Sequence, residues 1–188
     1  MKNNGQMTLM ALALLLGSSV VYAERNANVE IIGNIVTNTC DIYIPQHSYD
    51  LGNHAPEEFG KNGSANSVGR HQFILTVKNC SGTLVKKGDR LSLQVNEMGN
   101  TNNADAQNFY GEDNGTNAGV ELTMEGGVSI LAQQVSPVHP TYDIYVAQND
   151  GESLAGQQWL VMVAAEMAAV AVPAPGKIKA NLQFTMAE

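Results

Sequence analysis

Short segments in which apolar and polar residues alternate run along much of the chain. Arg90 to Asn96 alternates throughout, and Val120 to Met124 does the same before a glycine-rich turn signal. A period of two places successive side chains on opposite faces of a strand, and Gly, Asn and Asp between such runs are typical of turns. The pattern predicts an all-β sandwich or barrel. The expected strands include Gln72–Val77, Arg90–Asn96, Val120–Met124, Val128–Ala132 and Tyr142–Val146.

Two segments fit this pattern less well. Trp159 to Val163 is apolar at every position, as in a strand covered on both faces, and the alanine-rich stretch after it favours helix by propensity alone. Because two prolines follow Val172, we predict a strand and then a loop. Asn96 to Gly119 is rich in Asn, Asp and Gly, and its acids do not fit a calcium-loop spacing, so we predict a solvated surface loop.

The last segment of the chain alternates regularly from Lys177 to Met186. Such a strand has one core face and one solvent face. An edge strand with so apolar a face usually has a neighbouring strand, which the two residues after Met186 cannot form. The apolar face carries Ile178, Ala180, Leu182, Phe184 and Met186.

An extended segment near the N-terminus also alternates. Its polar face is interrupted by Ile32 and Val36, and its other face includes a glycine, Gly33. A glycine inside a strand costs entropy and often marks the close approach of another backbone. The residues on that face are Ala27, Val29, Ile31, Gly33 and Ile35.

The first 23 residues have the order of a secretory signal peptide. Lys2 precedes an apolar run from Met7 to Leu16, and Val21-Tyr22-Ala23 places small residues where a signal peptidase reads. An amphipathic first helix is the alternative. Cleavage after Ala23 takes 23 residues from the 188 and leaves 165, which suits one domain.

Cysteine content and charge agree with export. Cys40 and Cys80 are the only cysteines, and a single pair in an oxidising compartment is most simply a disulfide, with two free thiols or half a metal site as alternatives. Loss of the leader removes Lys2 and changes the net charge from −8 to −9. An acidic surface repels nucleic acid and anionic lipid, so neither is an expected partner.

Nothing in the sequence resembles an active site. The four histidines, His47, His54, His71 and His139, fall in no catalytic or metal-binding motif, and no serine occupies a Gly-x-Ser-x-Gly turn. The acids are scattered singly, which gives a paired-carboxylate hydrolase no support. We therefore expect a protein that is not an enzyme and that has no cofactor and no metal.

Four segments together resemble the chaperone–usher fimbrial subunits of the type 1 class. Val29 to Cys40 is similar to their opening, with an alternating arm and a glycine seven residues before the first cysteine. Tyr49 to Gly52 resembles their short leucine–glycine strand, Phe73 to Cys80 resembles the strand with their second cysteine, and Gly176 to Met186 resembles their last strand.

This resemblance implies an incomplete immunoglobulin-like sandwich that lacks its final strand and is completed by a donor strand from another chain. A periplasmic pilus chaperone would fill the groove first, and the arm of a neighbouring fimbrial subunit would replace it at an outer-membrane usher. Residues 24–37 would be the donor arm and residues 38–188 the pilin domain. Ala27, Val29, Ile31, Gly33 and Ile35 would be donor residues, and Ile178, Ala180, Leu182, Phe184 and Met186 would line the acceptor groove.

The expected function is that of a structural subunit, exported through the periplasm to a surface fimbria that supports adhesion. The alternative is a minor subunit with its own lateral adhesin activity through the Asn96–Gly119 loop, with a host receptor as partner. A tip adhesin would have an additional lectin domain, and a periplasmic chaperone would have two domains and usually a basic surface.

Overall fold

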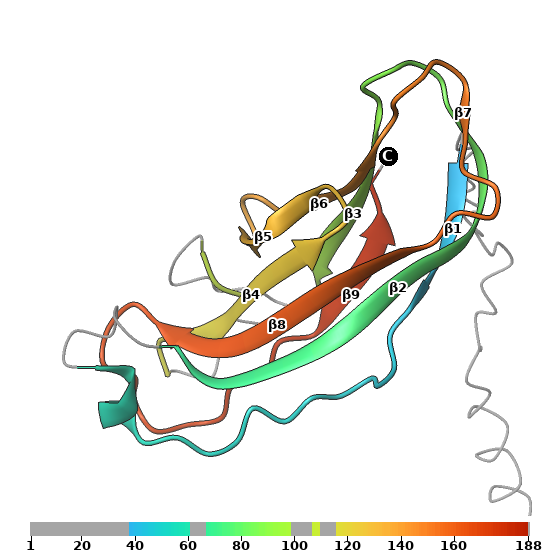
Figure 1. The fold of residues 1–188 in the computed structure, drawn as a ribbon. Helices are drawn as coiled ribbons and strands as arrows, with labels where there is room; N and C mark the ends of the chain where they lie inside the picture. Colours follow the sequence, from blue (N-terminus) through green and yellow to red (C-terminus); the bar gives the residue numbers. More distant parts are fainter. Residues whose placement is uncertain (1–37, 61–66, 99–106, 110–115, 188) are drawn as a thin grey trace, which may run out of the picture. The chain divides into compact units, whose positions relative to one another are not determined.

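The computed structural model describes residues 38–60, 67–98, 107–109 and 116–187, and nearly all of their regular structure is β-strand (Figure 1). The predicted signal peptide and the donor arm, residues 1–37, lie outside the described residues. Within the described part of the chain, the one helical element is the 3-10 turn η1 (Pro56–Phe59). Neither its length nor its composition would let it cross a bilayer.

The larger of two sheets has the strand order β1-β2-β8-β4-β5, and all its neighbouring strands are antiparallel. A two-residue strand, β7 (Glu152–Ser153), pairs with the end of β2. The bounds of the five main strands are Asn38–Tyr43 for β1, Val68–Leu84 for β2, Trp159–Ala169 for β8, Ala118–Gly126 for β4 and Ser129–Val135 for β5.

The smaller sheet has the order β6-β3-β9, formed by Thr141–Val146, Arg90–Glu97 and Leu182–Met186 respectively. Its central strand places Leu93 opposite Tyr142 on β6 and opposite Met186 on β9. The edges of both sheets come together in pairs, because β1 lies beside β9 and β5 lies beside β6.

The inward side chains of both sheets form one main core, which confirms the all-β sandwich expected from the alternation. Leu75, Leu93 and Val163 have no exposed surface, and their sequence neighbours point outward. The main core also contains Val77, Leu91, Val95, Leu122, Met124, Ile144 and Val161. A smaller cluster lies where β4 begins and β8 ends, and it consists of Phe59, Ala118, Met167 and Ala169.

The disulfide between Cys40 and Cys80 is present and joins β1 to β2. The sequence separation is 40 residues, and Cys80 belongs to the main core. Of the alternatives for the cysteine pair, free thiols and a metal site are therefore wrong.

The structure corrects the interpretation of Trp159 to Val172. β8 continues to Ala169 where a loop was expected, because the alanine-rich stretch lies between β2 and β4 and pairs with β4 to the end. Only one face of the strand is covered from Trp159 to Val163. Leu160 is 55% exposed and Met162 is 37% exposed on the outer face, whereas Ala164 further along the same face is 3% exposed.

Three shorter predictions also need correction. Residues 49–52 form no regular strand, and the final strand begins at Leu182, five residues later than expected. The loop predicted between Asn96 and Gly119 is not wholly solvated. Phe109 is completely buried in the main core, and its backbone pairs with Val120 of β4.

Candidate functional site

A groove opens on the side of the sandwich where β9 lies. It has a volume of about 1030 Å³ and runs between residues 44–59 and residues 173–184. One edge of β9 pairs with β3, and among the described residues no strand pairs with the other edge. Within the described part of the chain, the groove therefore lies beside an edge of β9 that has no strand partner.

The floor of the groove is the inner face of the larger sheet. Its residues come from β2, β4 and β8. Apolar side chains dominate it, so an occupant that reaches the floor would have to present apolar groups. The floor consists of Phe73, Ala118, Val120, Leu122, Ala165 and Met167.

One wall is formed by β9 and the residues before it. The alternation predicted from the sequence is visible in the exposure, since Lys177, Lys179 and Gln183 are exposed while the apolar positions between them are partly buried. Four of the five expected acceptor residues line the groove: Ile178, Ala180, Leu182 and Phe184. The fifth, Met186, does not line it and instead packs against the main core opposite Leu93.

The opposite wall, residues 44–59, has no strand ladder and depends on side-chain contacts. The Tyr49 ring stacks on Phe73 with 4.3 Å between centroids and an interplanar angle of 10°. The same ring lies 4.9 Å from that of His71. These contacts between side-chain rings attach the wall to β2.

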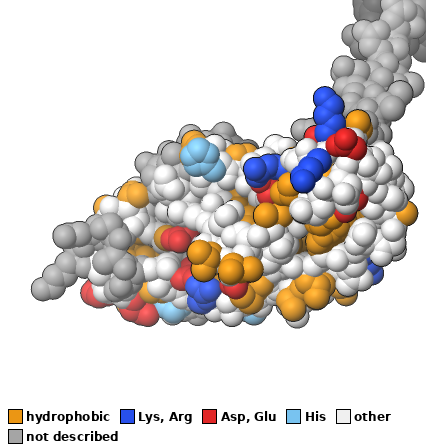
Figure 2. Space-filling view, turned by 45° about the horizontal axis from the view of Figure 1, so that its top comes forward, with side chains coloured by type: hydrophobic (Ala, Val, Ile, Leu, Met, Phe, Trp, Pro, Cys, Tyr) orange, Lys and Arg blue, Asp and Glu red, His pale blue; other side chains and the backbone are white. Residues whose placement is uncertain are grey.

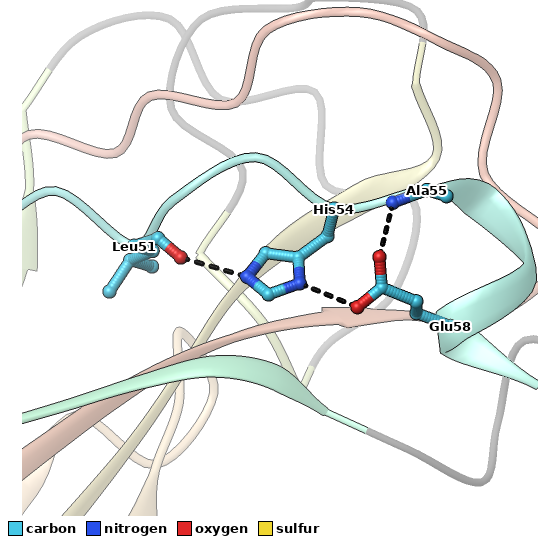
Figure 3. Close-up of polar contacts among 4 residues, drawn as sticks. All are labelled: Leu51, His54, Ala55 and Glu58. Atoms are coloured by element: carbon cyan, nitrogen blue, oxygen red, sulfur yellow. Dashed lines mark hydrogen bonds and ion pairs between the residues drawn. The ribbon is translucent and has the colours of Figure 1, made fainter.

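His54 fixes the end of this wall through both nitrogens of its ring (Figure 3). Nδ1 lies 2.9 Å from the Glu58 carboxylate and Nε2 lies 3.1 Å from the Leu51 carbonyl oxygen. Both partners are acceptors, so both nitrogens must donate, which requires the imidazolium form. The hydrogen bond to Glu58 raises the pKa of His54, and the same bond lowers the pKa of Glu58. Glu58 also accepts the backbone N–H of Ala55 at 2.7 Å, which ties η1 to the wall.

Gly69 lets the wall lie directly on β2. Its φ is +71°, and a Cβ built there would stand 2.2 Å from the Leu51 carbonyl oxygen and 3.1 Å from Nε2 of His54. Both the backbone conformation and the space therefore require glycine. Leu51 in turn packs against the smaller core cluster with Ile178 from the opposite wall.

The five donor residues expected from the sequence, Ala27 to Ile35, lie outside the described residues. Sequence reasoning missed the wall at 44–59 and the floor. The apolar alternation of Val120 to Met124 could have identified part of the floor as an inward face. No pattern indicated that this face lines a groove, because that depends on how the segments on either side of it are placed.

The shape and the apolar floor of the groove suit an extended segment with apolar side chains. The groove lining includes two histidines, but His54 is engaged by Glu58 and Leu51. Among the described residues no group of three or more His, Cys, Asp or Glu side chains is placed to hold a metal ion. On the face drawn in Figure 2, hydrophobic side chains form patches among polar and charged ones.

Comparison with known proteins identifies the family. The family model described as fimbrial protein matches residues 29–187. No curated protein matches the sequence. Among solved structures, the P pilus rod subunit PapA is similar with a TM-score of 0.41 and 15% identity, over 85% of this chain and 98% of that one. Since the family model spans most of the chain, the protein belongs to the fimbrial protein family and is a structural subunit of a surface fimbria, associating with other pilus subunits.

Proposed function

We propose that this subunit polymerises by donor-strand exchange, in which residues 24–37 of one copy fill the groove of another. The observation that carries the proposal is the groove itself, since it combines an apolar floor with an unpaired edge of β9. An extended segment placed there would add a strand to the smaller sheet. Its alternate side chains would point to the floor and would select the register.

The amino-acid composition of the arm fits such an occupant. Val29, Ile31 and Ile35 alternate on one face, and burial of each side chain would contribute about 1.5–3 kcal/mol. Gly33 on the same face has no side chain to bury. Its presence suggests a position where the floor already approaches the inserted backbone.

An uncovered groove is also a hazard for an exported subunit. An exposed apolar surface beside an unpaired strand edge promotes aggregation. We infer that a periplasmic chaperone covers the groove first and that an outer-membrane usher directs its replacement by the arm of the next subunit. In this function the subunit supports adhesion as part of the fibre.

The test uses chaperone-bound subunit and a synthetic peptide spanning Glu24 to Val36. The native peptide should displace the chaperone. A Gly33→Leu peptide should do so about 5-fold to 150-fold more slowly, because overpacking costs about 1–3 kcal/mol. An Asn34→Leu peptide is the control, since it places the same leucine side chain on the other face and should act at nearly the native rate. If the two leucine peptides act alike, Gly33 does not face the floor and the proposed register is wrong.

A further inference from the structure

The edge strand β5 carries the most exposed large apolar side chains described in the molecule. Ile130 is 86% exposed and Leu131 is 74% exposed, and Val128 just before the strand is 48% exposed. Ile130 and Leu131 lie in the irregular part of β5, where three residues stand opposite Glu125 of β4. Both side chains are exposed there, and no strand among the described residues pairs with the outer edge of β5.

The other three sheet edges differ from β5. β1 carries Asp41 and has an irregular register beside it. β6 carries Asp143, which forms an ion pair with Arg90, and its register is also irregular. β9 borders the groove. Charges and bulges are the usual protection of an edge against other chains. β5 also has an irregular register, since its residues 130–132 stand opposite Glu125 of β4, but it has no charged residue.

The charge distribution indicates which occupant fits this edge. The 17 residues from Gly126 to Tyr142 contain no Asp, Glu, Lys or Arg, in a chain with a net charge of −8. Two copies of an acidic protein repel each other, so they approach most easily where neither presents a carboxylate. A cationic partner would instead favour the acidic parts of the surface. An uncharged apolar strand edge therefore fits a second copy of the same chain.

We propose that β5, through Ile130 and Leu131, is a contact surface for another copy of this subunit within the fimbria. β5 is at the opposite end of the larger sheet from β1, and the groove lies on the β9 side, so this contact is separate from the groove. Two different surfaces would then link each copy to its neighbours. The inference needs only the membership in the fimbrial family and does not require strand exchange.

The experiment uses purified fimbriae of the full chain carrying Ile130→Cys labelled with a maleimide benzophenone. Both native cysteines are in the disulfide, so the new thiol is the only one available for labelling. Val85→Cys is the matched control, because Val85 is 59% exposed but is followed by Lys86 and Lys87. After irradiation, the label at position 130 should give covalent dimers of this chain at least about tenfold more than the label at position 85.

A second substitution shows whether the contact depends on the apolar edge. Leu131→Glu in the labelled Ile130→Cys chain should lower the dimer yield about tenfold, and Val85→Glu should leave it unchanged. Crosslinks to a different protein, equal yields at both labelled positions, or a yield insensitive to Leu131→Glu would overturn the proposal.

The proposal can still be tested if the β5 variants form no fibres. If the β5 variants fail to assemble and the Val85 variants do assemble, peptide displacement from the chaperone-bound subunit separates two cases. Displacement at the native rate would support β5 as an assembly surface, because the groove still functions. Impaired displacement would mean that the substitutions disturb the fold, and the β5 proposal would then be rejected. Failure of the native peptide itself would count against strand exchange and not against β5.

Discussion

The two sides of the sandwich differ in how the sheets are joined. On the β5/β6 side a short link connects the sheets, Ser136 and His139 exchange backbone hydrogen bonds, and the Tyr142 hydroxyl donates to the Gly126 carbonyl oxygen at 2.7 Å. On the β1/β9 side the strands are far apart in sequence, and residues 44–59 stand across a groove from residues 173–184. One side is closed by a short link of the chain, and the other side has a groove.

The same difference is visible in side chains on neighbouring strands. Leu93 of β3 is completely buried, whereas Leu182 of β9 is only partly buried, although both face inward. Leu93 has a strand on each side, and among the described residues Leu182 has a strand on only one side. The side chain of Leu182 therefore lines the groove and stays partly exposed.

The largest expected effect is that of removing the disulfide between β1 and β2, on the β1/β9 side. Replacing both Cys40 and Cys80 by alanine should lower the free energy of unfolding by about 4 kcal/mol, since the disulfide closes a loop between residues 40 apart in sequence. The measurement is denaturant unfolding of subunit whose groove is filled by the Glu24–Val36 peptide. A loss below about 1 kcal/mol would mean that the bond does little to stabilise this side.

Alanine substitutions at two leucines, one in the core and one in the groove, distinguish the roles of the two regions. Leu93→Ala should lower the free energy of unfolding by about 2–5 kcal/mol, because it leaves a cavity in a packed core, and it should not change the affinity for the peptide. Leu182→Ala should instead weaken peptide binding by about 1.5–3 kcal/mol. Equal effects of both variants on peptide affinity would erase the distinction between core and groove.

A glycine pair tests the wall at residues 44–59. Gly69→Ala should destabilise the subunit by about 1–3 kcal/mol more than Gly88→Ala, because only at Gly69 would the new Cβ meet the Leu51 backbone. Gly88 has a φ of +92° and nothing within 4 Å of its built Cβ, so it reports the conformational strain alone. If denaturant unfolding gives similar losses of unfolding free energy for the two variants, the wall moves freely.

The smallest effect should be that of the His54–Glu58 pair. The hydrogen bond between the two side chains raises the pKa of His54. The stability that His54 contributes is therefore complete below the ordinary pKa of 6.5 and is lost as the pH rises through the folded-state pKa. The pKa of Glu58 is lowered, so its contribution is present above 4.5 and is lost as the pH falls through its folded-state pKa.

The stability difference between the native chain and His54→Gln should therefore be greatest between about 4.5 and 6.5 and should decline on both sides. His47→Gln, on the same wall, is the control. Thermal unfolding across this pH range would measure both variants, and a flat difference for His54→Gln would contradict the imidazolium assignment.

Several features were predictable because they follow from local alternation. Arg90 to Asn96 and Tyr142 to Val146 became β3 and β6 almost at the predicted bounds. The inward face from Ile178 to Phe184 was equally predictable. The exposure of Leu160 was not predictable, because a run that is apolar at every position does not indicate which face another layer covers. Phe109 was missed because a buried residue among Asn, Asp and Gly carries no periodic signal.

By itself the sequence determined the strand content, the cysteine pair and the apolar face of the last strand, since each depends on residue type and on a period of two. Only the tertiary structure decided that β9 lies at an edge of the smaller sheet, that residues 44–59 stand opposite it and that the inner face of the larger sheet lines the groove between them. The physical reason is that burial depends on the arrangement of both sheets. Leu93 and Leu182 have the same side chain in the same alternating pattern, and only the position of neighbouring strands makes one of them core and the other a groove wall.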